Sequence, residues 1–226
     1  MINLIWDIDG TLLNTKGLGA GPFCDAFTHH TGKDAIIDKK KLSGFTDFEI
    51  ALSLMLDAGI QENFFLAETI LKSFSTRLEK VLAKNPPEVL GDIENTLEFT
   101  QMSSKFTNAI GTGNFRTGAH VKLKAAGIYK YFQKSKFYVA TPELWNRDAI
   151  IQSAALENAH LLNLVIGDSP RDISSARHAG MAVLAIPTGQ HTYQELDKMN
   201  PDFILHQDWT LKDFLSVIEQ FESIQS

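Results

Sequence analysis

The sequence predicts an α/β protein built on a doubly wound, Rossmann-like parallel sheet with an inserted α-helical domain. Short apolar runs recur along the chain, and most are followed by turn residues and then by a helical pattern. One stretch after the first run breaks this alternation, because it contains helical patterns but no convincing buried strand. At 226 residues the chain is long enough for one core domain with a smaller insertion.

The expected strands are apolar throughout rather than alternating with polar residues. This pattern is typical of parallel strands that helices cover on both faces. Strands that alternate with helices in turn predict a doubly wound sheet. The apolar runs are residues 2–8, 106–111, 137–140, 164–166 and 181–186, with 203–205 as a further candidate, and the helical patterns cover residues 90–102, 117–126, 147–158 and 171–179.

The inserted region is expected to be helical at residues 48–58 and 63–82, where apolar side chains recur at helical spacing. Three glycines within residues 16–22 could form one hinge between the two domains. Asn-Pro-Pro at residues 85–87 ends the last inserted helix and could form the other hinge. We therefore expect a core of residues 1–14 and 85–226 and a helical cap of residues 15–84.

Composition and charge argue against several classes of protein. The formal net charge is -6 at pH 7, which disfavours a nucleic-acid partner, and the one basic run, Lys39-Lys40-Lys41, is expected to be a solvated turn. Cys24 is the only cysteine, so an internal disulfide is impossible and a reducing compartment fits. No apolar stretch approaches the roughly 20 residues that span a bilayer, and the N-terminus lacks the features of a signal peptide. We expect a soluble, cytoplasmic protein without a membrane partner; its oligomeric state is left open.

Two carboxylates, Asp7 and Asp9, stand where the first buried strand ends. Ligands of open α/β sheets bind beyond the carboxyl ends of the strands, and side chains two residues apart in an extended chain face the same side. Gly10 permits a sharp turn there, and Thr11 adds a hydroxyl. Such a pair can serve as nucleophile and acid, or can hold a metal ion. The alternative is an Asp-Gly turn with a solvated second aspartate.

A second group of carboxylates follows another buried strand in the sequence GDSPRD. Ser169 could cap the next helix, and Pro170 suits the first turn of that helix. Asp168 would then lie at the strand tip and Asp172 within the first helical turn. Asp172 could simply complement the helix dipole, but this explanation leaves Asp168 without a role.

A third strand runs into Thr112-Gly113-Asn114, with a helix soon after. A hydroxyl and open backbone N–H groups near a helix N-terminus suit a phosphoryl oxygen. Thr-Gly-Asn is also an ordinary turn, so this motif is a weak signal by itself.

The motifs DIDGTLLN, AIGTGN and VIGDSPRD, in this order, resemble three motifs of the haloacid dehalogenase superfamily. The resemblance covers the whole chain, because the helical insertion resembles the α-helical cap of that superfamily. The segments LSGFTD, TGNFRTGAHVKLKAAGI and AIPTGQHT are most similar to the phosphoglycolate-phosphatase-like branch. The lysine usual for another family motif is missing from FYVATPELWNRDAII, and Arg147 is the candidate replacement. A surface arginine is the alternative interpretation of Arg147.

The resemblance implies roles that suit the chemistry of these residues. Asp7 would be the nucleophile, and Asp9 the general acid and then the base. Thr112 and Arg147 would hold phosphoryl oxygens. Mg²⁺ is the implied cofactor, and few protein ligands suffice because it retains waters and substrate phosphate. The implied metal residues are Asp7, Asp9 through its backbone carbonyl, Asp168, and Asp172, which would ligate or orient from just behind.

Substrate choice is expected to depend on the cap, with Thr46 and Asp47 in a loop that related proteins point at the core site. If Phe45 faces the site, it would disfavour a second anionic group on the substrate; packing inside the cap is the alternative. Thr46 could equally cap a helix, with Glu49 completing a capping box. The expected substrate-binding residues are Gly10, Thr11, Gly113, Asn114, Thr46 and Asp47.

These expectations point to a Mg²⁺-dependent phosphatase that hydrolyses a small-molecule phosphomonoester through an aspartyl-phosphate intermediate. Asp9 favours a phosphate ester over the superfamily's dehalogenase and phosphonatase reactions, because a leaving alkoxide needs a proton. A sugar phosphomutase on the same scaffold is the close alternative. A binding protein that keeps the fold without turnover is a further alternative, to which only the Arg147 exchange lends support.

Overall fold

The computed structural model describes residues 1–38 and 44–225 of the chain. Residues 39–43 and 226 are not described, so the expected solvated turn at Lys39-Lys40-Lys41 lies outside the described residues. No described helix is both long and apolar enough to cross a bilayer.

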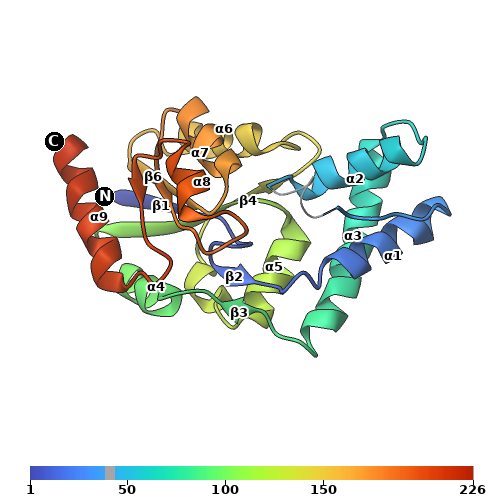
Figure 1. Ribbon diagram of the computed structural model, residues 1–226, viewed down its shortest axis with the longest axis horizontal. Helices are drawn as coiled ribbons and strands as arrows, with labels where there is room; N and C mark the ends of the chain where they lie inside the picture. The colour runs from blue at the N-terminus through green and yellow to red at the C-terminus, as the bar shows by residue number, and fades with distance from the viewer. Residues whose placement is uncertain (39–43, 226) are drawn as a thin grey trace.

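Six parallel strands form the central sheet in the order β5-β4-β1-β6-β7-β8 (Figure 1). β1 lies in the middle, where it pairs with β4 on one side and β6 on the other. The predicted doubly wound α/β core is therefore confirmed, and all six predicted strands are present. Their bounds are β1 Ile2–Trp6, β4 Phe106–Phe115, β5 Phe137–Ala140, β6 Leu162–Gly167, β7 Ala182–Ala185 and β8 Phe203–Ile204.

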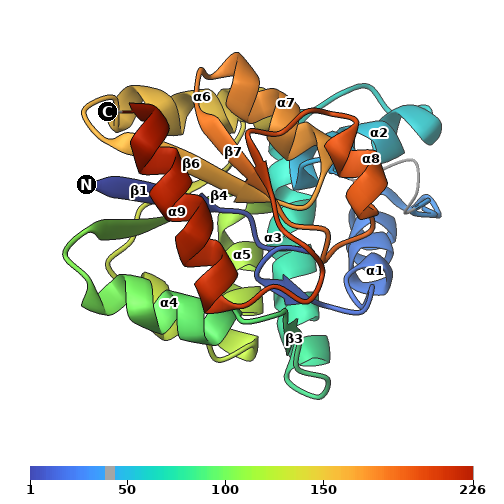
Figure 2. The same cartoon turned by 60° about the vertical axis from the view of Figure 1, so that its left-hand side comes forward.

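Helices cover both faces of the sheet (Figure 2). The side chains of β1 show why, since Ile5 packs into one apolar cluster while Leu4 and Trp6 pack into another on the opposite face. The Ile5 face is covered by α6 (Arg147–Glu157) and α7 (Pro170–His178), and the Trp6 face by α4 (Ile93–Met102), α5 (Arg116–Ala125) and α9 (Leu211–Gln225). The short helices η1 (Tyr129–Phe132) and α8 (Tyr193–Asp197) complete this domain.

The described part of the inserted region forms three helices beside the sheet: α1 (Ala20–Thr31), α2 (Asp47–Asp57) and α3 (Phe64–Leu82) (Figure 1). Phe27, Phe48 and Leu71 from these helices are buried in the same apolar cluster as Ile5. The apolar cluster of the cap is therefore continuous with that of the core, and α3 also packs against α5. The division into residues 1–14 with 85–226 and residues 15–84 remains our proposal.

The two chain crossings between core and cap lie side by side. β2 (Leu13–Asn14) pairs antiparallel with β3 (Glu88–Val89), and the Lys16 ammonium lies 3.1 Å from the Glu88 carboxylate. This two-stranded ribbon sits next to the glycine-rich and Asn-Pro-Pro stretches that were expected to be hinges.

Several elements were not identified from the sequence. α1 begins in the glycine-rich stretch, where Gly21 and Pro22 stand in its first turn; proline is tolerated there because its missing N–H has no helical partner to lose. α9 escaped notice although Phe214, Ile218 and Phe221 follow helical spacing. β4 extends beyond its predicted end to Phe115, with a shift of register after Thr112. The Thr-Gly-Asn motif is therefore the irregular end of a strand rather than a separate turn.

Candidate active site

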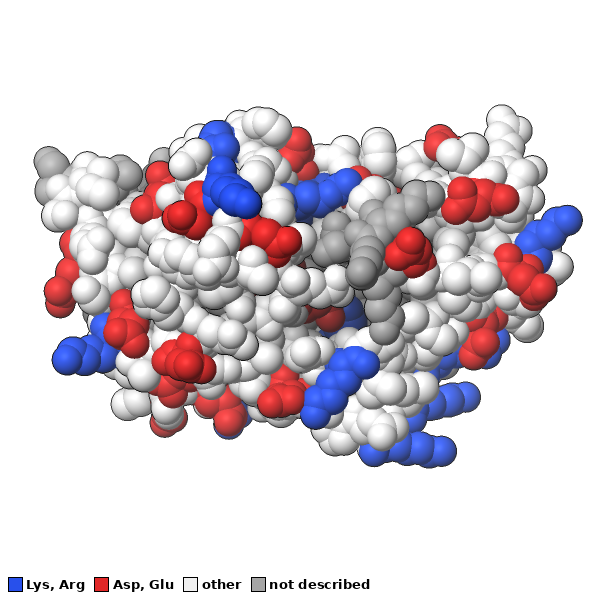
Figure 3. Space-filling model, viewed as in Figure 1, with Lys and Arg blue, Asp and Glu red and all other residues white. Residues whose placement is uncertain are grey.

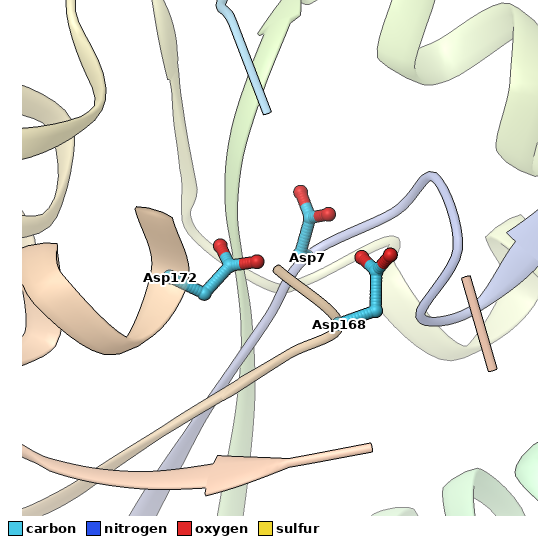
Figure 4. A group of neighbouring side chains, drawn as sticks. All are labelled: Asp7, Asp168 and Asp172. Carbon is cyan, nitrogen blue, oxygen red and sulfur yellow. The ribbon is translucent and has the colours of Figure 1, made fainter. Parts of the chain in front are cut away.

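Three buried carboxylates lie together at the carboxyl edge of the sheet (Figure 4). Asp7 follows β1, Asp168 follows β6, and Asp172 stands in the first turn of α7. One oxygen of each carboxylate lies within 4.8 Å of the others. The backbone N–H of Asp7 donates to the carbonyl of Ile166 at 3.0 Å, so the pairing of β1 with β6 fixes the positions of Asp7 and Asp168.

Burial makes the charged form of these carboxylates unfavourable. It raises the pKa of Asp7 to about 6, although the guanidinium of Arg147 opposes the shift. Burial also raises the pKa of Asp168 well above its ordinary value, and the negative charges of Asp172 and Asp7 add to the effect. The cluster is therefore poised to accept a cation.

Arg147 is the buried guanidinium that faces this cluster. It stands at the start of α6, with one Nη2 atom 2.9 Å from Asp7 Oδ1 and in contact with Asp172 Oδ1. Its Nε atom is buried without a hydrogen-bond partner among the described residues. The structure thus brings Arg147 to the expected nucleophile rather than leaving it on the surface.

The cluster fits a divalent metal ion. When all three carboxyl groups are ionised, they exceed the charge of the Arg147 guanidinium by two, which one such ion would balance. Oxygen atoms are also the ligands that Mg²⁺ takes. Gly10 and Gly189 leave room for Asp168, since a Cβ atom at either position would collide with its carboxylate. A metal ion is therefore the cofactor that the donor atoms suit.

Asp172 also shapes the start of α7. Its Oδ2 atom accepts hydrogen bonds from the backbone N–H of Ser169 at 3.1 Å and from the Ser169 hydroxyl at 2.6 Å. The predicted cap at Ser169 and the place of Pro170 in the first turn are confirmed. Because its Oδ1 atom contacts Arg147, Asp172 positions both the helix start and the guanidinium.

Asp9 lies in the same cavity as Asp7 but has different partners. Its Oδ2 atom accepts hydrogen bonds from the ammonium of Lys122 at 2.5 Å and from Asn114 Nδ2 at 2.7 Å. Burial by itself would lower the pKa of Lys122, but the charges of Asp9 and Asp47 outweigh it and raise that pKa. Lys122 therefore carries its charge inside the site.

Two of the three threonines expected at the site, Thr11 and Thr112, lie behind the residues that line the cavity. Thr112 is completely buried, and its hydroxyl oxygen accepts a hydrogen bond from Asn114 Nδ2 at 3.1 Å. The Thr11 hydroxyl donates to Asp168 Oδ1 at 3.2 Å. Neither belongs to the described residues that line the cavity, whereas Asn114 and Gly113 do.

The cap reaches the site through the N-terminal end of α2. Thr46 caps α2, and Glu49 completes the capping box, so the capping interpretation is correct. The Thr46 hydroxyl also donates to the carbonyl of Trp145 in the core. A Cβ atom at Gly113 would lie 2.9 Å from Thr46 Cα, so only glycine allows this close approach of cap and core.

Asp47, Phe45 and Ile50 are cap side chains that line the cavity at this end. Asp47 accepts a hydrogen bond from the backbone N–H of Phe115 at 2.7 Å, and burial raises its pKa to about 6. The guanidinium of Arg171 lies 4.0 Å from the centroid of the Phe45 ring and 2.9 Å from the Glu49 carboxylate. Because Phe45 lines the cavity, it faces the site rather than packing only inside the cap.

The cavity between core and cap has a volume of about 320 Å³. Its polar wall includes Asp7, Asp9, Asn114, Lys122, Arg147 and Asp168, and its apolar wall includes Phe23, Ile37, Phe45, Ile50 and Phe74. Lys122 was not predicted to be a site residue. The sequence pattern that could have identified it is a charged residue on the buried face of α5. Lys122 stands three residues after the buried Ala119 and four after the buried Gly118.

Comparisons with known proteins agree with this geometry. The sequence matches a family model described as "Haloacid dehalogenase-like hydrolase" over residues 4–186. The chain belongs to this family. A relative from Dickeya dadantii named "Probable phosphatase IndB" is 26% identical to this haloacid dehalogenase-like hydrolase over 209 residues, which cover 89% of the chain and 88% of the relative.

Solved structures share the same fold. A hydrolase from Pseudomonas syringae superposes with a TM-score of 0.72 at 18% identity, covering 96% of this chain and 99% of that one. A protein from Haemophilus somnus described as a predicted phosphoglycolate phosphatase has a TM-score of 0.66 at 20% identity, covering 96% and 97% of the two chains. The superfamily and the α/β fold expected from the motifs are confirmed.

Proposed function

We propose that the protein is a Mg²⁺-dependent phosphatase that hydrolyses a small-molecule phosphomonoester, similar to phosphoglycolate phosphatases, through an aspartyl-phosphate intermediate. Its family and its phosphatase-named relative make it an enzyme of the phosphoric monoester hydrolase class. The observation that carries the finer proposal is that Asp7 and Asp9 line one cavity beside a cluster suited to a divalent ion. The cytoplasm is the proposed location.

In the first step an Asp7 oxygen attacks phosphorus and the bond from phosphorus to the alcohol oxygen breaks. Asp9 gives its proton to the departing oxygen, so the alcohol leaves neutral. Arg147 faces Asp7 with an unpartnered buried Nε–H, a donor suited to a phosphoryl oxygen. Mg²⁺, held by Asp7, Asp168 and the Asp9 carbonyl, with Asp172 ligating or orienting from behind, would reduce the repulsion between carboxylate and phosphate.

In the second step water attacks the phosphorus of the aspartyl-phosphate. Asp9, now a carboxylate, accepts a proton from that water, and the bond from phosphorus to the Asp7 oxygen breaks. Phosphate leaves, Asp7 is again a carboxylate, and Asp9 is again protonated. The cap excludes bulk water while the first step takes place.

The test is phosphate release from a panel of phosphomonoesters with and without Mg²⁺, with Asp7→Asn as the blank. The panel contains phosphoglycolate, sugar phosphates, nucleotides and an aryl phosphate. We expect Mg²⁺-dependent release that is absent from the variant. Release that continues at the full rate in Asp7→Asn would remove the nucleophile assignment. No release from any ester, with interconversion of sugar 1-phosphates instead, would contradict hydrolysis and identify a phosphomutase.

A further inference from the structure

We propose that Lys122 is a positioning residue for the general acid: together with Asn114 it holds one oxygen of Asp9 and turns the other oxygen toward the substrate. This inference rests on the proposed phosphatase function. It assigns a role to a residue outside the motifs DIDGTLLN, AIGTGN and VIGDSPRD.

In the ion pair between Lys122 and Asp9, the lysine side chain is buried and the aspartate side chain is partly exposed. The Lys122 side chain is 8% exposed, whereas that of Asp9 is 39% exposed, and both line the cavity. Lys122 reaches the site from the last turn of α5, where Ala119 and Leu123 are buried in the apolar cluster on the Trp6 face of the sheet. A rigid helix therefore sets the position of the ammonium group.

Both donors to Asp9 act on the same oxygen. Lys122 Nζ and Asn114 Nδ2 lie 2.5 Å and 2.7 Å from Oδ2. Within residues 1–38 and 44–225, Oδ1 receives no side-chain hydrogen bond. An oxygen that accepts two hydrogen bonds is a poor site for a proton, so Oδ1 is the atom that carries the proton to the leaving alcohol.

Asn114 is held in turn by the core. Its Nδ2 atom also donates to the buried hydroxyl oxygen of Thr112 at 3.1 Å. Asp9 thus stands at the end of a chain of contacts that begins inside β4. Loss of either donor would free the Asp9 carboxyl group to rotate.

The cap contributes a counterion to the same arrangement. The carboxylate of Asp47 is close enough to Lys122 for their opposite charges to attract. Its position is fixed by the 2.7 Å hydrogen bond that its Oδ2 atom accepts from the backbone N–H of Phe115. The ammonium therefore has a carboxylate on its core side and another on its cap side. This placement favours a Lys122 that stays in the site while the cap is closed over the core.

The role has a consequence that depends on the leaving group. An alkyl alcohol is a poor leaving group and needs the proton from Asp9, whereas a nitrophenol leaves readily without it. We therefore compare kcat/KM for an alkyl phosphate and for 4-nitrophenyl phosphate, because kcat/KM covers only the steps up to departure of the alcohol. The variants are Lys122→Met, which keeps most of the side-chain volume, and Lys122→Arg. Lys124→Ala, an exposed residue on the same helix, is the matched control.

We expect Lys122→Met to lower kcat/KM for the alkyl phosphate by about 100-fold and for the aryl phosphate by less than about tenfold. Lys122→Arg should restore part of the alkyl activity, and Lys124→Ala should match the wild type. An equal loss with both esters, or no loss, would overturn the proposal. If Lys122→Met fails to fold by thermal melting, Lys122→Gln replaces it in the same comparison.

A crystal structure of the variant tests the inference without turnover. In Lys122→Met the Asp9 carboxyl group should leave the orientation it has in the wild type, while Asp7 and Asp168 keep theirs. An unchanged Asp9 would overturn the positioning role. A wild-type protein that releases no phosphate from either ester would contradict the proposed function instead, and the position of Asp9 would still decide this inference.

Discussion

Arg147 connects the expected nucleophile to the rest of the acidic cluster. It contacts Asp7 and Asp172 at once, and both it and Asp172 are almost fully buried. Its planar guanidinium can serve two oxygens at fixed angles, which a lysine ammonium in this place would do less rigidly. The position that departs from the usual family lysine therefore keeps a cation beside the nucleophile.

This contact predicts a large difference between two arginines. Arg147→Ala should lower kcat/KM by about 100-fold or more, as expected for the loss of a donor that holds transition-state charge. Arg116→Ala, at the exposed start of α5, should change it by less than about threefold. Steady-state kinetics of the two purified variants measures this. Equal losses would show that Arg147 acts no differently from a surface arginine.

Asp47 predicts a dependence of stability on pH. Its pKa is about 6 in the folded protein against an ordinary 3.8, so the folded state binds the proton more tightly and the group destabilises the fold as pH rises from about 4 to 6. Asp47→Asn keeps an oxygen for the Phe115 N–H. The free energy of unfolding of Asp47→Asn should therefore rise relative to that of the wild type by up to roughly 3 kcal/mol between pH 4 and pH 7.

Urea unfolding of both proteins at several pH values in that range gives the difference between their free energies of unfolding. The contributions of other titrating groups are the same in both proteins and cancel in this difference. A constant gap between wild type and Asp47→Asn would contradict the raised pKa. If the free energy of unfolding of Asp47→Asn instead fell relative to that of the wild type as pH rises, the pKa of Asp47 would be lowered by folding rather than raised.

At the scale of elements, α2 attaches the cap to the core by its first turn. Thr46 donates to the Trp145 carbonyl, and Glu49 contacts Arg171 of α7 through both carboxylate oxygens, at 2.9 and 3.1 Å. The Arg171 guanidinium also covers the Phe45 ring. These contacts hold α2 against the core, while the paired β2 and β3 connect the domains at the other end.

Removal of the Arg171 contacts should favour an open cap. A part-buried ion pair and a cation–π contact together stabilise by about 1 kcal/mol, so Arg171→Ala should raise the ratio of open to closed cap by about fivefold. Small-angle scattering should show a larger radius of gyration, and kcat/KM should fall with the closed fraction, by at most about fivefold. A double-mutant cycle with Glu49→Ala isolates the pair; additive effects would show that the two side chains do not act together.

At the scale of the whole molecule, the apolar cluster runs from the sheet into the cap, while charged groups gather at the junction. On the outer face drawn in Figure 3, acidic and basic side chains are interspersed. The buried carboxylates near the junction oppose folding unless a cation compensates them. Metal binding and stability are therefore expected to be linked.

Mg²⁺ should stabilise the protein as well as activate it. At a concentration one hundred times its dissociation constant it would add about 2.7 kcal/mol, which raises the melting temperature by roughly 5 to 10 °C for a protein of this size. EDTA should remove both the shift and the activity. Asp168→Asn should abolish the shift, whereas the exposed Asp34→Asn should retain it. A melting temperature that does not change when Mg²⁺ is added would contradict the proposed metal site.

The elements that the sequence revealed are those with a strong local pattern. Uninterrupted apolar runs identified the strands of the main sheet, and α2 and α3 began and ended within a residue or two of the expected bounds. α1 was hidden because glycine and proline at its start are also the residues of loops. β2 and β3 have two residues each, too few for any periodicity.

The sequence by itself determined the α/β fold, and the resemblance of its motifs indicated the superfamily. The sequence also brought Asp7, Asp9 and Asp168 together, because side chains that follow buried parallel strands meet at one edge of the sheet. Only the tertiary structure placed Lys122 against Asp9, 113 positions away along the chain, and Arg171 over Phe45. Such contacts depend on how a helix face and a cap loop pack across the sheet. That packing is a property of the folded chain as a whole, and a local pattern of residues does not specify it.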